Sequence, residues 1–471
     1  MNYVSEIQNF KRMGHDLVDQ IAEYLESSLN ETSKVINYNP ATTEYEYWKD
    51  YQPLNMTAFH SDLFARSIRL HHPNYMGHQV SAPNLQVALL GLTSDLMNNG
   101  MGIYEMGAAA VAMEQYVINT FSNHIGYDTT HSNGFLTSGG TLANLTALLA
   151  ARASCQDLYP NIDNEHIHII VSEQAHFCIE RAWLTMGLPA RNIHKVDVNS
   201  AFQINPQGVE STYRSIIDNQ GVVLAVVGCA CSTATGSYDD IGWLSSFCQR
   251  NKLWLHVDGA HGGAVVFSKK LKKELLQGIE MANSVVIDAH KMMQTPALAT
   301  AVLFKNYLDS YSSFSQKASY LFDQSEIDPY NLAKRTYETT KYMMSIKVFF
   351  LMKSVGIKHL ALFIERQYAL TSWLYHTLVI DSDFDCAHQP QSNILCFRYI
   401  KSDDINTINR IIREELLQEG KFYIVSTILN GRYYLRVTLM NHWTEKRHLE
   451  ALIDNIKHKA QEISLRSNLI S

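Results

Sequence analysis

The sequence predicts an α/β protein whose large domain contains a mostly parallel β-sheet. Short apolar runs rich in β-branched residues indicate strands at "HIHIIVSE" (ending at Glu173), "VVLAVVGCA" (222–230), "LWLHVDG" (253–259) and "SVVIDA" (284–289). Helical stretches such as "TLANLTALLAARA" lie between them. Apolar runs that alternate with helices are typical of parallel strands covered by helices on both faces.

Two further parts flank this domain, so we expect a segment over 1–81, a large domain over 82–356 and a small domain over 357–471. An amphipathic helix over 10–28 opens the first part, and residues 30–60 show no clean period. The apolar face of that helix consists of Met13, Leu17, Val18, Ile21 and Leu25. In the last part, two helical patterns alternate with "SNILCFRYI", "KFYIVSTIL" and "RYYLRVTLM", which favours a small α+β unit.

The overall composition is that of an ordinary globular protein. The chain is 46% hydrophobic and 18% charged, with a net charge of −7 and no long basic run, so we expect no nucleic-acid partner. No apolar stretch approaches the ~20 residues that span a bilayer, so we expect no membrane partner. The start "MNYVSEIQNFKRMGHDLVDQ" has no apolar signal core, and seven scattered cysteines fit a reducing compartment. These features predict a cytoplasmic protein.

Chemistry is expected at the ends of the strands, because ligands of α/β sheets bind there. In "FLTSGGTLANL", Gly139 and Gly140 stand between an apolar start and a helix that begins near Thr141. Free N–H groups and the helix dipole make such a turn an anion site, although a Gly-Gly helix start is also a common structural feature. In "SEQAHF", His176 follows a strand, where a histidine can be a ligand contact or an ordinary polar residue.

Two charged residues follow the next strands. Asp258 ends "LWLHVD" beside small residues that leave room for a planar ligand, and a buried carboxylate there needs a cationic partner or several donors. Lys291 follows "SVVIDAH". In an apolar pocket its pKa is expected to fall, which would free an amine that attacks a carbonyl to form an imine. The alternative is a lysine that extends to the surface.

Together these groups meet the needs of pyridoxal phosphate. A lysine can hold the aldehyde as a Schiff base, an aspartate can keep the pyridinium nitrogen protonated, and a glycine turn can bind the phosphate. The sequence also resembles the group II pyridoxal-phosphate-dependent amino-acid decarboxylases, relatives of glutamate and aromatic amino-acid decarboxylases. The resemblance runs from about Phe10 to Ile463 and is carried by "FKRMGHDLVDQIAEYL", "HPNYMGHQ", "TSGGTLANL", "SEQAH", "LWLHVDGAHGG", "IDAHKM", "SNILCFRY" and "YYLRVTLMN".

The resemblance implies an aspartate-aminotransferase-like fold (fold type I), a homodimer and the decarboxylation of an amino acid to its amine. Lys291 matches the Schiff-base lysine, Asp258 the pyridinium partner and His176 the histidine that stacks on the ring. Residues that match the family's cofactor contacts are Gly140, Thr141, His176, Thr233, Asp258, Ala260, His290 and Lys291.

The resemblance also assigns residues to the substrate. Arg436 matches the arginine that holds the substrate carboxylate, and Gln79 is a candidate for positioning the bond that breaks. Tyr330, in "IDPYNLAKR", is the candidate for the loop tyrosine that protonates the product carbon, and Tyr320 is its competitor. Gly259 departs from the alanine usual in the family, so we expect looser packing under the ring.

Other functions remain open from the sequence. A metal hydrolase could use His256, Asp258 and His261 with His290, because histidine and aspartate are common ligands. A non-catalytic relative could bind the cofactor as a partner module, and an aminotransferase or a decarboxylating aldehyde synthase could use the same residues. The segment "HPNYMGHQVSAPN" is expected to line the substrate pocket, and its mixed side chains leave acidic, diamino and aromatic amino acids open.

Overall fold

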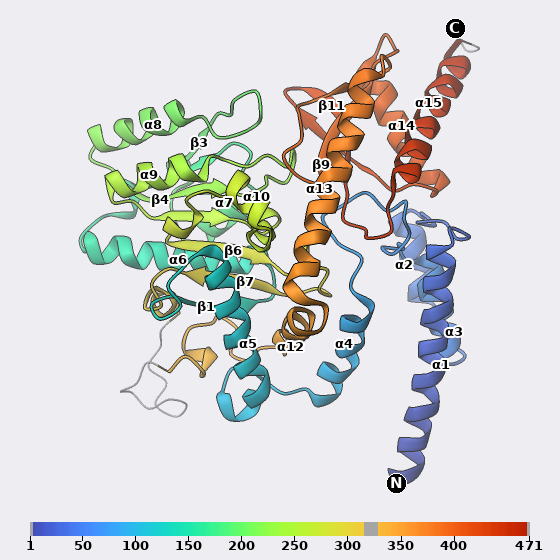
Figure 1. The fold of residues 1–471 in the computed structure, drawn as a ribbon, viewed down its shortest axis with the longest axis horizontal. Helices are drawn as coiled ribbons and strands as arrows, with labels where there is room; N and C mark the ends of the chain where they lie inside the picture. The colour runs from blue at the N-terminus through green and yellow to red at the C-terminus, as the bar shows by residue number, and fades with distance from the viewer. Residues whose placement is uncertain (1–2, 315–327, 469–471) are drawn as a thin grey trace. The chain divides into compact units, whose positions relative to one another are not determined.

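A computed structural model describes residues 3–314 and 328–468 of the 471-residue chain. The chain forms two compact units (Figure 1). The larger unit comprises Pro83–Ala369 with Pro390–Ser392, and the smaller unit comprises Met1–Ala82, Leu370–Gln389 and Asn393–Ser471. The three-part division expected from the sequence stays a prediction. Among the described residues, no helix combines the length and the apolar character that crossing a membrane requires.

The larger unit is built on a seven-stranded sheet with the order β1-β7-β6-β5-β4-β2-β3. Neighbouring strands are parallel from β6 to β3, whereas β7 runs antiparallel to both β1 and β6. The strands are β1 (Asn133–Thr137), β2 (Ile167–Ser172), β3 (Ile193–Val196), β4 (Val222–Cys229), β5 (Leu255–Asp258), β6 (Ser284–Asp288) and β7 (Thr300–Phe304). The predicted α/β class with a mostly parallel sheet is confirmed.

Helices cover both faces of this sheet. Helix α6 packs against five of its strands, while α8 and α9 pack on the opposite side (Figure 1). The helices are α4 (Leu85–Met97), α5 (Tyr104–Ile125), α6 (Gly140–Leu158), α7 (Phe177–Thr185), α8 (Pro206–Asp218), α9 (Ile241–Asn251), α10 (Lys269–Leu275), α11 (Asp309–Ser312), α12 (Ser345–Phe350) and α13 (Ile357–Ile380). The last of these begins in the larger unit and ends in the smaller one.

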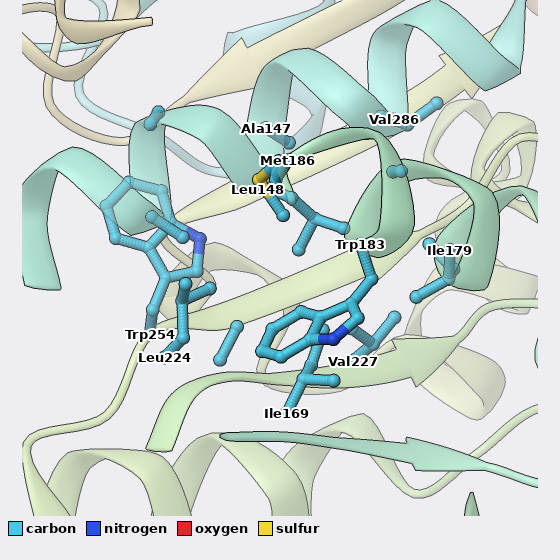
Figure 2. Packing of buried hydrophobic residues seen from close by; sticks show 14 of the residues in the cluster. Ala147, Leu148, Ile169, Ile179, Trp183, Met186, Leu224, Val227, Trp254 and Val286 are labelled. Carbon is cyan, nitrogen blue, oxygen red and sulfur yellow. The ribbon is translucent and has the colours of Figure 1, made fainter. Parts of the chain in front are cut away.

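The core between the sheet and helices α6 and α7 is a continuous apolar cluster. Trp183 of α7 is fully buried and lies with Ile169 and Val227 of the sheet in this cluster (Figure 2). Its indole N–H donates to the Pro189 carbonyl at 2.9 Å, so the polar edge of a buried ring is satisfied. This packing fixes the starts of α6 and α7, where predicted site residues lie.

The smaller unit contains a four-stranded antiparallel sheet with the order β10-β11-β9-β8. Asn430 and Gly431 form the two-residue turn between β10 and β11, and both have positive φ (50° and 74°), as a type I′ turn requires. Its elements are α1 (Tyr3–Leu29), α2 (Ala41–Lys49), α3 (Met56–Arg66), β8 (Phe384–Cys386), β9 (Ile394–Tyr399), α14 (Ile405–Glu419), β10 (Val425–Leu429), β11 (Arg432–Thr438) and α15 (Lys446–Asn468). The predicted small α+β unit is confirmed.

The N-terminal segment joins this unit through backbone and ring contacts. The Val35 amide donates to the Gly420 carbonyl at 2.8 Å, and the Met76 amide to the Tyr423 carbonyl at 2.9 Å. The Tyr75 and Tyr423 rings stack with centroids 5.5 Å apart. Segments that are far apart in the sequence therefore share one core.

Candidate active site

A cavity of about 500 Å³ opens at the carboxyl ends of the parallel strands of the larger unit. Its walls come from the turns after β1, β2, β4, β5 and β6. It brings together all the residues predicted from the family's cofactor contacts, namely Gly140, Thr141, His176, Thr233, Asp258, Ala260, His290 and Lys291. These positions are far apart in the sequence, so their meeting is a property of the fold.

The glycine turn after β1 forms one end of the cavity. Gly139 has a φ of 137°, which side chains rarely allow, and α6 begins at the next residue. A Cβ on Gly140 would lie 3.4 Å from both Ala260 Cβ and Asp288 Oδ1, so the turn is tightly packed on that side. The unpaired N–H groups of the first turn of α6 suit a phosphate.

His176 caps helix α7 at the wall of the cavity. Its Nδ1 accepts a hydrogen bond from the Cys178 amide at 3.2 Å, so Nε2 carries the proton of the neutral ring. Burial lowers the pKa of His176, and the nearby Asp258 carboxylate only partly offsets this. The ring is therefore neutral and fixed in orientation, as a group that lies flat against a cofactor would be.

Asp258 is the last residue of β5. One carboxylate oxygen, Oδ1, accepts from the Ala260 amide at 3.2 Å. The sequence leads us to expect loose packing at the neighbouring Gly259, and this expectation is wrong. A Cβ there would lie 2.8 Å from the Val286 carbonyl oxygen and 3.0 Å from Gly263 Cα, so the space of the missing methyl is already filled.

His256, two residues before Asp258, is committed to a buried hydrogen-bond network. Its Nε2 lies 2.8 Å from Asn144 Oδ1 and its Nδ1 lies 2.9 Å from Ser284 Oγ. Burial lowers the pKa of His256 to about 4, so its ring stays neutral near pH 7. Because both ring nitrogens form hydrogen bonds, His256 is not available as a ligand in the metal site that was considered from the sequence. Within residues 3–314 and 328–468, no three His, Cys, Asp or Glu side chains gather as a metal site.

Lys291 forms an ion pair that was not predicted. Its Nζ lies 3.1 Å from Oδ2 of Asp288, whose side chain is only 1% exposed. Burial lowers the pKa of Lys291, but the carboxylates of Asp288 and Asp258 together raise it by more, so the net shift is upward. The predicted fall in the pKa of Lys291 is therefore wrong for the cofactor-free protein. The signal that could have revealed this is an aspartate at the strand end, three residues before the lysine.

Asn144 and Cys178 also line the cavity, and sequence reasoning missed both. The Asn144 amide donates to Cys178 Sγ at 3.2 Å. Burial, followed by the Asp258 carboxylate, raises the pKa of the Cys178 thiol to about 12, so it stays protonated. This sulfur is a neutral wall of the cavity and not a ready nucleophile.

Four predicted residues remain, namely Tyr330, Tyr320, Gln79 and Arg436. Tyr330 lines a different cavity of about 640 Å³, where its ring meets Tyr104 edge-on with centroids 5.8 Å apart. Tyr320 lies outside the described residues. Gln79 and Arg436 belong to the smaller unit, where the charge of Arg436 adds to burial in lowering the pKa of His78. The roles of all four residues stay predictions.

The comparisons with known proteins agree with this geometry. Residues 54–400, most of the chain, match the pyridoxal-dependent decarboxylase conserved domain. The chain therefore belongs to the pyridoxal-dependent decarboxylase family. The predicted class of enzyme, a pyridoxal-phosphate-dependent amino-acid decarboxylase, and its cofactor, pyridoxal 5′-phosphate, are confirmed.

The similarity extends along nearly the whole chain. It is 25% identical over 477 residues to an aromatic-L-amino-acid decarboxylase of Bacillus atrophaeus, with 97% of each protein covered. It is 23% identical to an L-2,4-diaminobutyrate decarboxylase of Acinetobacter baumannii, with 93% of this chain and 89% of that protein covered. The crystal structure of 4-hydroxyphenylacetaldehyde synthase from Rhodiola rosea has a TM-score of 0.85 at 21% identity and covers 98% of each chain, which shows the shared fold alone.

Proposed function

We propose that this protein converts an L-amino acid to the corresponding amine and carbon dioxide, using Lys291 to hold pyridoxal phosphate. The observation that carries the proposal is the single cavity lined by Lys291, Asp258 and His176 beside the start of α6. A lysine amine, a strand-end carboxylate, a neutral ring and a helix N-terminus form the donor set that this cofactor needs.

Each residue has a part in this proposal. Lys291 would hold the cofactor aldehyde, and Asp258 would keep the proton on the pyridine nitrogen. The neutral ring of His176 would face the cofactor ring. The groups assigned to the rest of the cofactor are Gly140, Thr141, Thr233, Ala260 and His290. When bound, pyridoxal phosphate supplies an electron sink for the pair left on Cα as carbon dioxide departs.

Substrate orientation decides which bond of the amino acid breaks. Only a bond held perpendicular to the cofactor ring can pass its electrons into the ring system, so positioning selects the reaction. We assign the substrate carboxylate to Arg436, with Gln79 beside it, and the return of a proton to Cα to Tyr330. These three assignments rest on the family resemblance.

The attachment of the cofactor is tested by reduction and mapping. The purified protein is expected to be yellow, and borohydride is expected to lock the cofactor onto the peptide that contains Lys291. The same treatment of Lys291→Arg should leave that peptide unmodified. A modified peptide that maps to another lysine in the wild-type protein would contradict the assignment.

The reaction and its substrate are tested together. Acidic, diamino and aromatic L-amino acids are supplied separately, and carbon dioxide, amine, aldehyde and keto acid are measured. One amine per carbon dioxide supports decarboxylation. Aldehyde in place of amine would indicate the alternative of an aldehyde synthase, and keto acid without carbon dioxide would indicate an aminotransferase.

We further propose a cytoplasmic homodimer with both active sites at its interface. Four leucines on α4 recur every three or four residues and leave one face of the helix apolar and exposed, namely Leu85, Leu89, Leu92 and Leu96 (39%, 65%, 56% and 70% exposed). A contiguous apolar face of this kind marks an interaction surface. Sedimentation is expected to give a dimeric mass, and Leu89→Glu with Leu96→Glu should shift it toward the monomer. A wild-type monomer with full activity in dilute solution would refute the dimer.

A further inference from the structure

The larger unit contains a second cavity, of about 830 Å³, at the opposite edge of the sheet from the candidate active site. It lies at the amino ends of β4, β5 and β6, and the C-terminal parts of α6, α8 and α9 complete its walls. Helix α6 begins at the active-site cavity and ends at this second cavity, and its 19 residues span about 28 Å. A ligand in the second cavity would therefore not compete for space with the amino acid that the enzyme acts on.

The inner wall of the second cavity is apolar and belongs to the core of the unit. Trp254 lies beside Leu224 there, and both side chains are buried, as is that of Leu255 (Figure 2). The Trp254 indole N–H donates to Ser284 Oγ at 2.9 Å, so this ring needs no polar partner from a ligand. Burial raises the pKa of the Cys248 thiol to about 12, so this group stays neutral. Such a wall offers a ligand a large apolar contact area without any charge.

The outer part of the second cavity is lined by apolar side chains that are exposed to solvent. Leu158 and Tyr159, at the end of α6, are 67% and 48% exposed, and Ile217 of α8 is 44% exposed. Exposed apolar side chains that gather in one place mark an interaction site. A cavity of this size with mostly apolar walls and a few polar groups is typical of small-molecule sites.

Two lysines supply all the charge among the described residues that line this cavity. Lys252, the residue after α9, is exposed, and Lys305, which follows β7, is half-buried. The Lys305 ammonium donates to Met281 Sδ at 3.8 Å, and a thioether is only a weak acceptor. Within residues 3–314 and 328–468, the lysines that form ion pairs with carboxylates do not include these two. The lining charge therefore favours an anionic ligand.

The helix ends around the cavity oppose this preference only in part. The C-terminal ends of α6, α8 and α9 each carry a partial negative charge of about half a unit, which favours a cation. Each lysine carries a full positive charge, and Lys252 is itself the C-cap of α9, where it offsets that helix end. An amine with the same apolar body is consequently the control ligand that discriminates best.

We propose that this cavity is a second binding site, for a small molecule with an apolar or aromatic body and a carboxylate head group. The body packs on Trp254 between Leu158 and Ile217, and the carboxylate binds the ammonium groups of Lys252 and Lys305. The inference goes beyond the proposed function and does not depend on it, because no residue lines both cavities.

A photoreactive aromatic carboxylate tests the site and the ligand class together. 4-Benzoylbenzoate is equilibrated with the cofactor-bound enzyme, dialysis gives its affinity, and irradiation followed by peptide mapping gives its location. The label is expected on peptides that contain Leu158, Ile217 or Met281. The matched neutral and cationic probes, 4-benzoylbenzamide and 4-benzoylbenzylamine, should bind more weakly than the carboxylate.

Lysine variants test which groups recognise the carboxylate. Lys252→Gln and Lys305→Gln should each weaken its binding about threefold, and the double variant about tenfold, because exposed ion pairs are individually weak. Lys269→Gln removes an exposed lysine of α10 outside the cavity and should bind the probe as the wild type does. Lys252→Glu with Lys305→Glu should invert the preference from the carboxylate to the amine. Circular dichroism checks the folding of each variant.

Every result of these measurements supports or overturns the proposal. Label on the cavity peptides, with carboxylate binding that the lysine variants weaken and Lys269→Gln does not, supports it. No binding of the carboxylate at millimolar concentration overturns the site, and so does label found only on other peptides, those of the active site included. Equal or tighter binding of the amide or the amine overturns the ligand class, and unchanged binding in the double glutamine variant overturns recognition by the two lysines.

Discussion

Two buried lysine–carboxylate pairs in the larger unit have the same chemistry and opposite surroundings. The Lys341 side chain is fully buried and pairs with Glu114, whose side chain is 2% exposed. The Lys291 side chain is 21% exposed, pairs with Asp288 and lines the cavity. One pair is sealed in the protein, and the other borders a space that a ligand can enter.

The net charge around each amine decides the direction of its pKa shift. Burial lowers the pKa of Lys341; the Glu114 carboxylate opposes this, but the neighbouring Arg335 guanidinium adds to the lowering. Lys291 faces two carboxylates and no comparable cation, so its pKa is raised. Lys341 also has a second carboxylate nearby, that of Glu338, so the Arg335 guanidinium and the complete burial of Lys341 separate the two lysines.

The sealed pair connects separate parts of the chain. Glu114 is on α5, and its Oε1 also accepts from the Leu136 amide of β1 at 2.9 Å. Arg335 nearby donates to the Pro329 carbonyl at 3.0 Å. This cluster fixes the segment before α12 against α5 and β1. Its role is structural, whereas the contact between Lys291 and Asp288 is open to chemistry.

The largest expected effect separates the two lysines by activity. Lys291→Met should lose covalent cofactor and lower decarboxylation by about 10²–10⁴-fold or more, because both the attachment and a proton-transfer group are removed. Lys341→Met should keep the imine absorbance and most of the activity when it is assayed under conditions in which the variant is folded. The absorbance and the release of carbon dioxide are measured on the same samples. Loss of the imine absorbance in folded Lys341→Met would contradict the purely structural role given to Lys341.

A second prediction concerns Tyr330, which follows Pro329, the residue that Arg335 contacts. If Tyr330 returns the proton to Cα, Tyr330→Phe should bind cofactor and substrate and still release carbon dioxide. The yield should then shift from amine toward aldehyde or aminated cofactor, because the carbanion stays exposed. Amine and aldehyde are measured per carbon dioxide. An unchanged ratio in Tyr330→Phe, with a shift in Tyr320→Phe, would move the role to Tyr320.

The sequence predicted those helices and strands whose buried residues form a recognisable pattern along the chain. Strands β4 and β6 are continuous apolar runs, buried along nearly their whole length, and they were found. Helices α2 and α3 have no buried side chain, and they were missed because no apolar period exists to detect. In β3 only Val196 is buried, so its four residues gave no strand pattern.

The candidate site shows the same limit. Each of Gly140, Asp258 and Lys291 stands at or just after the end of a strand, so local patterns and the family resemblance found them. The contact between Lys291 and Asp288 depends on how the turn after β6 folds back, and the Asn144–Cys178 contact joins two helices. Such contacts arise from tertiary structure, so they are missing from the local pattern.

A third prediction sharpens the comparison through stability. Lys341→Met removes the ion-pair partner of the buried Glu114 and leaves it only the Leu136 amide and the more distant Arg335 charge, so it should lower the free energy of unfolding by about 3–5 kcal/mol. Lys291→Met should cost less, because the Lys291 side chain is 21% exposed and its contact with Asp288 borders the cavity, where water can solvate the carboxylate. Urea unfolding of the cofactor-free proteins measures both. Equal losses in the free energy of unfolding would show that the neighbouring cavity does not lower the cost of leaving Asp288 without its ion-pair partner.

The smallest expected effect is a difference in pH dependence. An unfolded lysine titrates near pH 10.4. Because the pKa of Lys341 is lowered in the folded protein, its contribution to stability is fully present above about that pH and is lost as the pH falls toward the folded value. The pKa of Lys291 is raised, so its contribution is fully present below about pH 10.4 and is lost as the pH rises through the folded value.

The two variants should therefore diverge from wild type in opposite ways. The stability gap between wild type and Lys341→Met should widen as the pH rises from about 8 toward 10.4, by at most about 1.4 kcal/mol per pH unit. The gap between wild type and Lys291→Met should stay constant over that range and shrink above it. Urea midpoints of the cofactor-free proteins across this range give both curves. Two gaps that change in the same direction would mean that the surroundings of the two lysines do not shift their pKa values in opposite directions.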